Sequence, residues 1–192
     1  MSFFAFANGP VLRPNRREFL TKSGIVLSGT AVALMAGRDA LAKVGGKATE
    51  DDVKILNSAL ASELEAIAAY QVGAESGLLQ KPVLDLAVTF QSHHKAHAQV
   101  LAGTIEKLGG KPVAAKAKYD FPVATLKTQN DVLRFAASLE KGAVSAYLGA
   151  VPVFADRNLS RAAASILGDE AMHWAILRNA VGEAPVPAAF VG

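Results

Sequence analysis

The residues best able to do chemistry in this 192-residue chain are its four histidines, which fall in two short stretches. His93, His94 and His97 lie in one stretch and His173 in the other. His94 with His97, and Glu170 with His173, have the i, i+3 spacing that places two side chains on one face of a helix. Imidazole nitrogens and carboxylate oxygens bind iron, manganese and zinc in proteins. Both pairs are therefore candidate metal-binding motifs.

Two glutamates extend this pattern into a repeat. Glu63 and Glu140 each precede a tyrosine, Tyr70 and Tyr147, by seven residues. The first residue of a histidine-containing pair follows Glu63 after 31 residues and Glu140 after 30. Recurrence of ligand-type side chains at nearly equal spacing indicates a duplicated half, with both halves contributing to one site.

Four helices are predicted to position these residues, over about 49–77, 82–110, 128–152 and 158–182. Thr49, followed by three acidic residues, is typical of a helix start, and Pro82 suits a first turn. Strand-type alternation is not evident after the first 42 residues. The expected fold class is all-α, a four-helix bundle.

Each predicted helix carries an apolar stripe with steps of three and four residues, the period of a bundle seam. Buried carboxylates are costly when unpaired, and bound cations offset that cost, whereas pairing between glutamate and histidine offsets only part of it. A single seam histidine is more often a hydrogen-bonded core residue, but a set of six favours a metal site. The six candidate ligands all lie in the stripes: Glu63, His94, His97, Glu140, Glu170 and His173.

The connections predict how the helices are paired. Short links make the first and second helices, and the third and fourth, antiparallel neighbours. Glu63 and His94 then lie at similar heights on either side of the first turn, and Glu140 and Glu170 do so on either side of the second. A stretch of about 20 residues, 109–128, separates the hairpins. Two hairpins joined by one long crossover form the ferritin-like arrangement.

With these motifs, the sequence resembles the ferritin-like superfamily over about residues 50–182. It is similar to exported bacterial ferritin-like domain proteins, distantly related to rubrerythrin and bacterioferritin. The resemblance implies a di-iron site, with Glu63 and Glu140 as terminal ligands and Glu170 as a bridging ligand. It also implies that His97 and His173 each bind one iron.

His94 departs from that pattern, because it stands where a second bridging glutamate is expected. An alternative register, Gln91 with His94, would place an amide there instead. Three carboxylates leave two divalent cations with residual positive charge, and a histidine bridges two metals only after losing its second nitrogen proton. The site is thus compatible with two metals bridged by Glu170 and hydroxide, with one metal, or with manganese or zinc.

Four further residues are expected near the ligands but not on the metal itself. Tyr70 and Tyr147 lie two turns along from the glutamates, where they either hydrogen-bond ligands or serve as core aromatics. Gln91, one turn before His94, is expected to orient it. His93 points off the seam and is interpreted as a surface or outer residue.

Residues 1–42 are interpreted as a twin-arginine signal peptide and not as part of the fold. Arg16 and Arg17 precede an uncharged run, 23–37, and an Ala40-Leu41-Ala42 cleavage motif. We expect cleavage after Ala42, a periplasmic location and the twin-arginine export machinery as a partner. The bundle is then expected over 43–183, with an irregular tail over 184–192.

Charge and composition narrow the function further. The signal contributes the whole net charge of +3, and the remaining 150 residues carry fifteen basic and fifteen acidic side chains. Nucleic-acid binding is therefore not expected. With no cysteine, thiolate catalysis and disulfide stabilisation are excluded.

Two functions fit these observations. One is an exported, metal-binding redox protein that handles O₂, peroxide or iron in the envelope under oxidative stress, as a di-iron oxidase, peroxidase or ferroxidase. The alternative is a non-enzymatic, stress-associated structural or partner-binding bundle with a degenerate metal site. A homo-oligomer is compatible with both, and the substrate does not follow from the sequence.

Overall fold

The computed structural model describes residues 46–191, with side chains described from residue 49. The helices are α3 (Gly46–Glu75), α4 (Lys81–Lys107), α5 (Gln129–Ala150) and α6 (Arg157–Ala180), with a short 3-10 turn, η1 (Val123–Thr125). No strand occurs between residues 46 and 191. The prediction of an all-α four-helix bundle is confirmed. The signal peptide expected at 1–42 lies outside the described residues.

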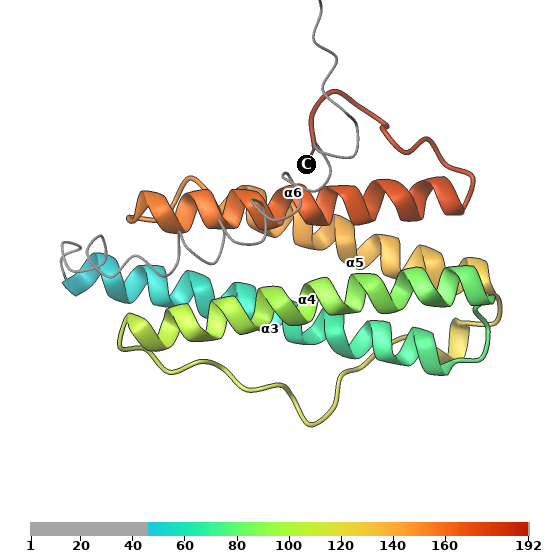
Figure 1. The fold of residues 1–192 in the computed structure, drawn as a ribbon, viewed down its shortest axis with the longest axis horizontal. Coiled ribbons are helices and arrows are strands. Elements are labelled where there is room, and N and C mark those ends of the chain that lie inside the picture. The colour runs from blue at the N-terminus through green and yellow to red at the C-terminus, as the bar shows by residue number, and fades with distance from the viewer. Residues whose placement is uncertain (1–45, 192) are drawn as a thin grey trace, which may run out of the picture.

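The helices form two antiparallel hairpins joined by one long connection (Figure 1). α3 packs against α4 and α5 packs against α6, while α3 also contacts α5. The connection over residues 108–128 runs along the length of the bundle, so that α4 and α5 point in the same direction (Figure 1). This is the single-crossover arrangement that the spacing of the predicted helices indicated.

The helix ends show where local sequence signals hold and where they do not. The Thr128 hydroxyl accepts a hydrogen bond from the Asp131 backbone N–H, and the Asp131 carboxylate accepts one from the Thr128 N–H, forming a capping box. α6 begins slightly earlier than predicted, because Asp156 caps it. The prediction of a helix start at Thr49 is wrong: α3 already begins at Gly46, since Lys47 and Ala48 favour helix.

Glycines in the left-handed region follow three of the helices near their predicted ends, the first being Gly77 after α3 with φ of 70°. Gly109 follows α4 with φ of 81°, and Gly182 follows α6 with φ of 78°. A side chain at any of these positions would be strained, so these residues release the chain from the helix at little cost.

A buried aspartate fastens the α5–α6 link to the start of α3. The carboxylate of Asp52 accepts hydrogen bonds from the backbone N–H groups of Ala155 (2.8 Å) and Asp156 (3.1 Å). Two donors that no helix satisfies are thereby paired. The contact sets the end of one hairpin against the other.

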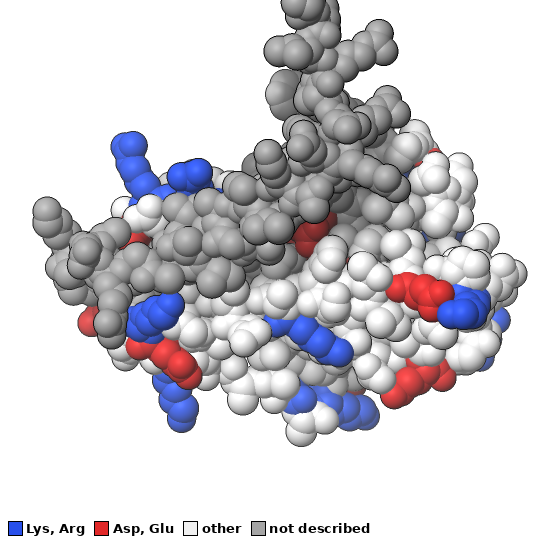
Figure 2. Space-filling view, viewed as in Figure 1, with Lys and Arg blue, Asp and Glu red and all other residues white. Residues whose placement is uncertain are grey.

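The core consists of two apolar clusters with a polar layer between them. The larger cluster includes Leu56, Leu101 and Ile105, and the smaller one includes Phe90 and Leu133. The outer surface carries both signs of charge: Figure 2 shows basic and acidic side chains interspersed over the visible face. Among the described residues, no helix has the length and apolar composition that a membrane span requires.

Candidate metal centre

The polar layer contains all six predicted ligand residues, contributed by the four helices. Glu63 lies on α3, His94 and His97 on α4, Glu140 on α5, and the remaining pair on α6. Five of the six side chains are at most 2 % exposed, and that of His97 is 16 % exposed. The period of the apolar stripes therefore identified residues that lie in one layer, although they are up to 110 positions apart in the chain.

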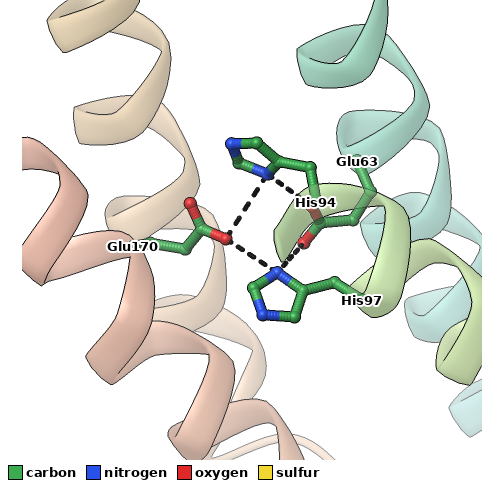
Figure 3. A group of neighbouring side chains, drawn as sticks. All are labelled: Glu63, His94, His97 and Glu170. Carbon is green, nitrogen blue, oxygen red and sulfur yellow. Dashed lines mark hydrogen bonds and ion pairs between the residues drawn. The ribbon is translucent and has the colours of Figure 1, made fainter. Parts of the chain in front are cut away.

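One group of ligand-type atoms lies between α3, α4 and α6. His94 Nδ1 is 2.8 Å from Glu63 Oε2 and 3.6 Å from Glu170 Oε1. His97 Nδ1 is 3.6 Å from Glu63 Oε1 and 3.1 Å from Glu170 Oε1. Figure 3 shows these four side chains pointing toward one another across the bundle. One atom from each of the four residues lies within 4.8 Å of the others.

A second group lies beside the first and shares two of its members. Its residues are His94, Glu140, Glu170 and His173, again with one ligand atom each within 4.8 Å. His173 Nδ1 is 3.5 Å from Glu140 Oε1 and 3.7 Å from Glu170 Oε2. His94 Nε2 is 3.3 Å from Glu140 Oε1, so the ring presents one nitrogen to each group. Glu170 likewise directs Oε1 to one group and Oε2 to the other.

Several of these atoms are buried without a hydrogen-bond partner. They are His97 Nδ1, Glu140 Oε2, both carboxylate oxygens of Glu170, and His173 Nδ1. Leaving a buried polar atom unpaired costs about 1–3 kcal/mol, so five in one layer is an unusual concentration. Ligand atoms of neighbouring residues approach several of them to 3.1–3.7 Å without forming a hydrogen bond, as expected of side chains arranged around an ion. The donor set fits one or two transition-metal ions.

The tyrosines cross between the hairpins. The Tyr147 hydroxyl of α5 donates to Glu63 Oε1 of α3 at 2.6 Å, and the Tyr70 hydroxyl of α3 donates to Glu140 Oε1 of α5. Each hydroxyl binds a carboxylate of the other hairpin, a pairing that the seven-residue spacing did not specify. The hydrogen bond from Tyr70 leaves Glu140 Oε2 free for a metal.

Without metal, the centre holds charges that stabilise one another. Burial raises the pKa of Glu63, but His94 and His97 outweigh this and bring the pKa to about 2. Burial lowers the pKa of His94, whereas Glu140 and Glu63 raise it to about 10. The pKa values of His97 and His173 are raised in the same way to about 9, and burial raises that of Glu170. A metal ion must therefore displace protons from the imidazoles.

Asp169 is a residue of the site for which the sequence suggested no role. Its Oδ2 is 3.4 Å from His97 Nε2 and 3.4 Å from His173 Nε2, the nitrogens that face away from the two groups. Asp169 Oδ2 also hydrogen-bonds to His93 Nδ1 (3.1 Å), which lies 2.9 Å from His173 Nε2, so Asp169 and His93 together contact the outer edges of these rings. The sequence did contain an indication of this position, because Asp169 precedes His173 by four residues, about one turn of a helix.

The structure corrects the expectation for Gln91. Its amide donates to the Ile67 carbonyl (3.0 Å) and to Gln71 (2.9 Å), and its oxygen accepts from Lys95 (2.8 Å). These contacts tie α4 to α3. Gln91 is buried near the site, but its hydrogen bonds run to the helix surface instead of to His94, which is held by the carboxylates.

A cavity of about 310 Å³ reaches the centre from the α3–α5 side. Glu63, His94 and Glu140 line it, together with small residues such as Ala66 and Gly142. A cavity of this size has room for several water molecules or another small molecule beside the carboxylates.

Solved structures with the same fold include proteins with metal centres. The chain has a TM-score of 0.64 and 22 % identity to the Desulfovibrio desulfuricans bacterioferritin, which has a diiron site, over 72 % of this chain and 84 % of that one. It has a TM-score of 0.61 and 20 % identity to ferritin-like, diiron-carboxylate proteins from Bacillus anthracis, over 72 % and 99 %. A dodecameric thioferritin, the bacterioferritin-related protein from Bacteroides fragilis, has a TM-score of 0.61 and 25 % identity, over 80 % and 93 %.

A search of curated protein sequences found no match. The profile of the ferritin-like domain matches residues 51–183, a range that begins in the first turns of α3, ends just after α6 and contains all six candidate ligands. The chain therefore belongs to the ferritin-like domain family.

Proposed function

We propose that this protein binds two transition-metal ions, with iron as the first expectation, and uses them in redox chemistry on O₂, peroxide or ferrous iron. The observation that carries the proposal is the set of five buried ligand atoms without hydrogen-bond partners. The diiron site of the Desulfovibrio desulfuricans neighbour favours iron. Manganese and zinc remain compatible with three imidazoles and three carboxylates.

The two metal positions would differ in their protein ligands. Glu63, His94, His97 and Glu170 would hold one ion, with His94 binding through Nδ1. A neutral imidazole that binds through one nitrogen keeps its proton on the other. The Nε2–H of His94 then donates to Glu140 Oε1, 3.3 Å away. The second ion would be held by Glu140, Glu170 and His173 alone, which leaves more of its coordination open to a small molecule.

The chain's other residues would prepare this centre for redox chemistry. A pair of iron ions supplies the electrons that reduce O₂ or peroxide, or accepts them from ferrous iron. The two tyrosine hydroxyls fix the terminal carboxylates, while Asp169 fixes the outer edges of two imidazoles. The apolar clusters at either end exclude bulk water, and the α3–α5 cavity admits small molecules.

A second candidate function rests on the ion pairs. His94 and Glu63 are 2.8 Å apart and both buried, so imidazolium–carboxylate pairing stabilises part of the layer without metal. A non-enzymatic bundle, structural or partner-binding, would retain this pairing alone. It predicts that transition metals do not raise the melting temperature.

Metal content separates the two functions. Purified protein is reconstituted with ferrous iron under anaerobic conditions, desalted, and analysed by mass spectrometry for iron, manganese and zinc. We expect one to two equivalents in the wild type and a clear loss in Glu140→Ala and Glu170→Ala. Asp156→Asn, a change at a buried carboxylate outside the centre, is the matched control. Less than about a tenth of an equivalent in the wild type would contradict the proposal.

We further propose that the protein acts in the periplasm after twin-arginine export. The support is the sequence of residues 15–42 and the advantage of exporting a folded, metal-loaded protein. Replacing Arg16 and Arg17 by lysine should retain the protein in the cytoplasmic fraction.

Assembly is a separate proposal, suggested by the dodecameric neighbour from Bacteroides fragilis. Light scattering of the purified protein would distinguish a monomer from an oligomer.

A further inference from the structure

A third group of ligand-type atoms lies on the outer side of the centre, between α4 and α6. It consists of His93, Asp169 and His173, with one atom from each within 4.8 Å of the others. His93 Nδ1 is 3.1 Å from Asp169 Oδ2 and 2.9 Å from His173 Nε2. The side chains of His93 and Asp169 are 42 % and 22 % exposed, whereas that of His173 is 2 % exposed. The group thus leads from the surface to a buried imidazole.

Its composition suits a divalent transition metal. Two imidazole nitrogens and one carboxylate oxygen are a common donor set for iron, cobalt and zinc. The side chains are also held in place before any ion binds. Phe90 stacks on the His173 ring with centroids 4.0 Å apart, and Asp169 contacts His97 as well. An ion arriving from solvent would replace the hydrogen bonds that His93 Nδ1 makes with Asp169 and His173, and would displace the proton held there.

His173 belongs to both the outer group and the buried centre. Its Nε2 faces His93 and Asp169, while its Nδ1 faces Glu140 and Glu170. A neutral imidazole offers one lone pair, so the ring cannot bind a metal at both nitrogens at once. An ion held outside through Nε2 leaves a proton on Nδ1. An ion held inside through Nδ1 leaves a proton on Nε2, which faces His93 Nδ1 at 2.9 Å and Asp169 Oδ2 at 3.4 Å.

We propose that His93, Asp169 and His173 form an outer binding site for one divalent transition metal, from which the ion passes to the buried centre. The inference rests on the proposed metal binding of the centre but concerns different residues and a different step. On transfer, the metal moves from Nε2 to Nδ1 of His173, while one proton leaves Nδ1 and one is taken up at Nε2. The step needs no net protonation and no redox partner. The outer site is filled during loading and vacated when the centre is full.

Cobalt(II) uptake by the full chain tests the loading step, because its visible absorption reports binding in real time and its total is measured by mass spectrometry. His93→Gln is the informative variant, since His93 is half-exposed and makes no contact with the inner carboxylates among the interactions described. We expect the same final stoichiometry as in the wild type, with loading slowed about tenfold or more. Ser92→Ala, at the exposed neighbouring position, should load normally. Loading of His93→Gln within about twofold of the wild-type rate would overturn the proposal.

A second measurement is independent of the inner centre. In the variant Glu63→Gln with Glu170→Gln, the buried centre loses two anionic ligands while the outer group is intact. Equilibrium dialysis should show one bound cobalt(II), which is lost when His93→Gln is added. Failure of the Glu63→Gln, Glu170→Gln variant to bind cobalt(II) would refute the outer site, whatever the wild-type centre holds. Three tightly bound cobalt(II) ions in the loaded wild type would also refute it, because His173 cannot serve both positions.

Discussion

Replacing Glu170 by glutamine separates a metal ligand from a structural carboxylate. Glu170 is fully buried, and neither of its oxygens has a hydrogen-bond partner. Burial raises its pKa, and the neighbouring Glu140 raises it further against the opposing effect of His173 and His97, so the ionised form is penalised when no metal is bound. Glutamine has nearly the same volume and carries no charge. We therefore expect the metal-free variant to be as stable as the wild type, or up to about 2 kcal/mol more stable.

The metal-bound proteins should differ in the opposite direction. At a metal concentration of about 100 times the dissociation constant, binding stabilises the wild type by about 2.7 kcal/mol. In a domain of this size, that corresponds to a rise in melting temperature of roughly 5–11 °C. Glu170 faces both groups of ligands, so its loss should weaken binding by a factor on the order of 100. At the same metal concentration, the stabilisation falls to about 0.4 kcal/mol, a rise of about 1–2 °C.

The assay is thermal unfolding of chelator-treated and metal-loaded protein, for the wild type and for Glu170→Gln. Asp156→Asn is the matched control, because it makes the same chemical change at a buried carboxylate outside the centre. The control should show the wild-type response to metal. A full metal-induced rise in Glu170→Gln would refute the assignment of Glu170 as a ligand. A large loss of stability in the metal-free variant would show instead that the ionised carboxylate is structural.

Three other predictions concern the surrounding structure. Tyr147→Phe removes a hydrogen-bond donor to the buried carboxylate of Glu63 and should lower the free energy of unfolding by about 1.5–3 kcal/mol, as measured by urea denaturation. The same change at Tyr119, the control, should lower it little. Asp52→Ala leaves two backbone N–H groups unpaired and should cost about 2–4 kcal/mol, with Asp52→Asn recovering part of the loss in the same assay. The raised pKa values of the buried histidines stabilise the metal-free fold below about pH 6.5, and this contribution is lost as the pH rises through about 9–10. The lowered pKa of Glu63 stabilises the metal-free fold above about pH 4.5, and this contribution is lost as the pH falls toward 2. The melting temperature of metal-free protein should therefore be highest between about pH 4.5 and 6.5.

The sequence predicted the helices and the six-residue cluster because both depend on a local period. Side chains that step by three and four residues share a helix face, and a polar residue inside such a stripe must lie in the core. Glu63 and Glu140 were identifiable for this reason. The start of α3 was missed because Thr49 resembles a capping residue but is preceded by residues that continue the helix.

The contacts between helices could not be predicted, because they depend on how the faces meet. Asp169 lies about 100° around α6 from Glu170, a position that would usually face solvent. It enters the site only because α4 brings His93 and His97 to that side. Gln91 shows the opposite case. Its position one turn before His94 suggested a contact with that residue, but its amide donates hydrogen bonds to residues of α3. No spacing within one helix determines these partners.

The crossed tyrosines have a consequence for how the two halves of the fold are aligned. Tyr70 and its acceptor Glu140, like Tyr147 and its acceptor Glu63, lie on different hairpins, so each hairpin supplies a hydrogen-bond donor to a buried carboxylate of the other. Sliding one hairpin along the other by a single helical turn, about 5.4 Å, would break both hydrogen bonds at once and leave each buried carboxylate without its tyrosine donor. Small residues such as Ala66 and Ala143, which line the α3–α5 cavity, discriminate poorly between such registers. The two tyrosines therefore favour the observed axial register of the hairpins, and these hydrogen bonds are present without a bound metal.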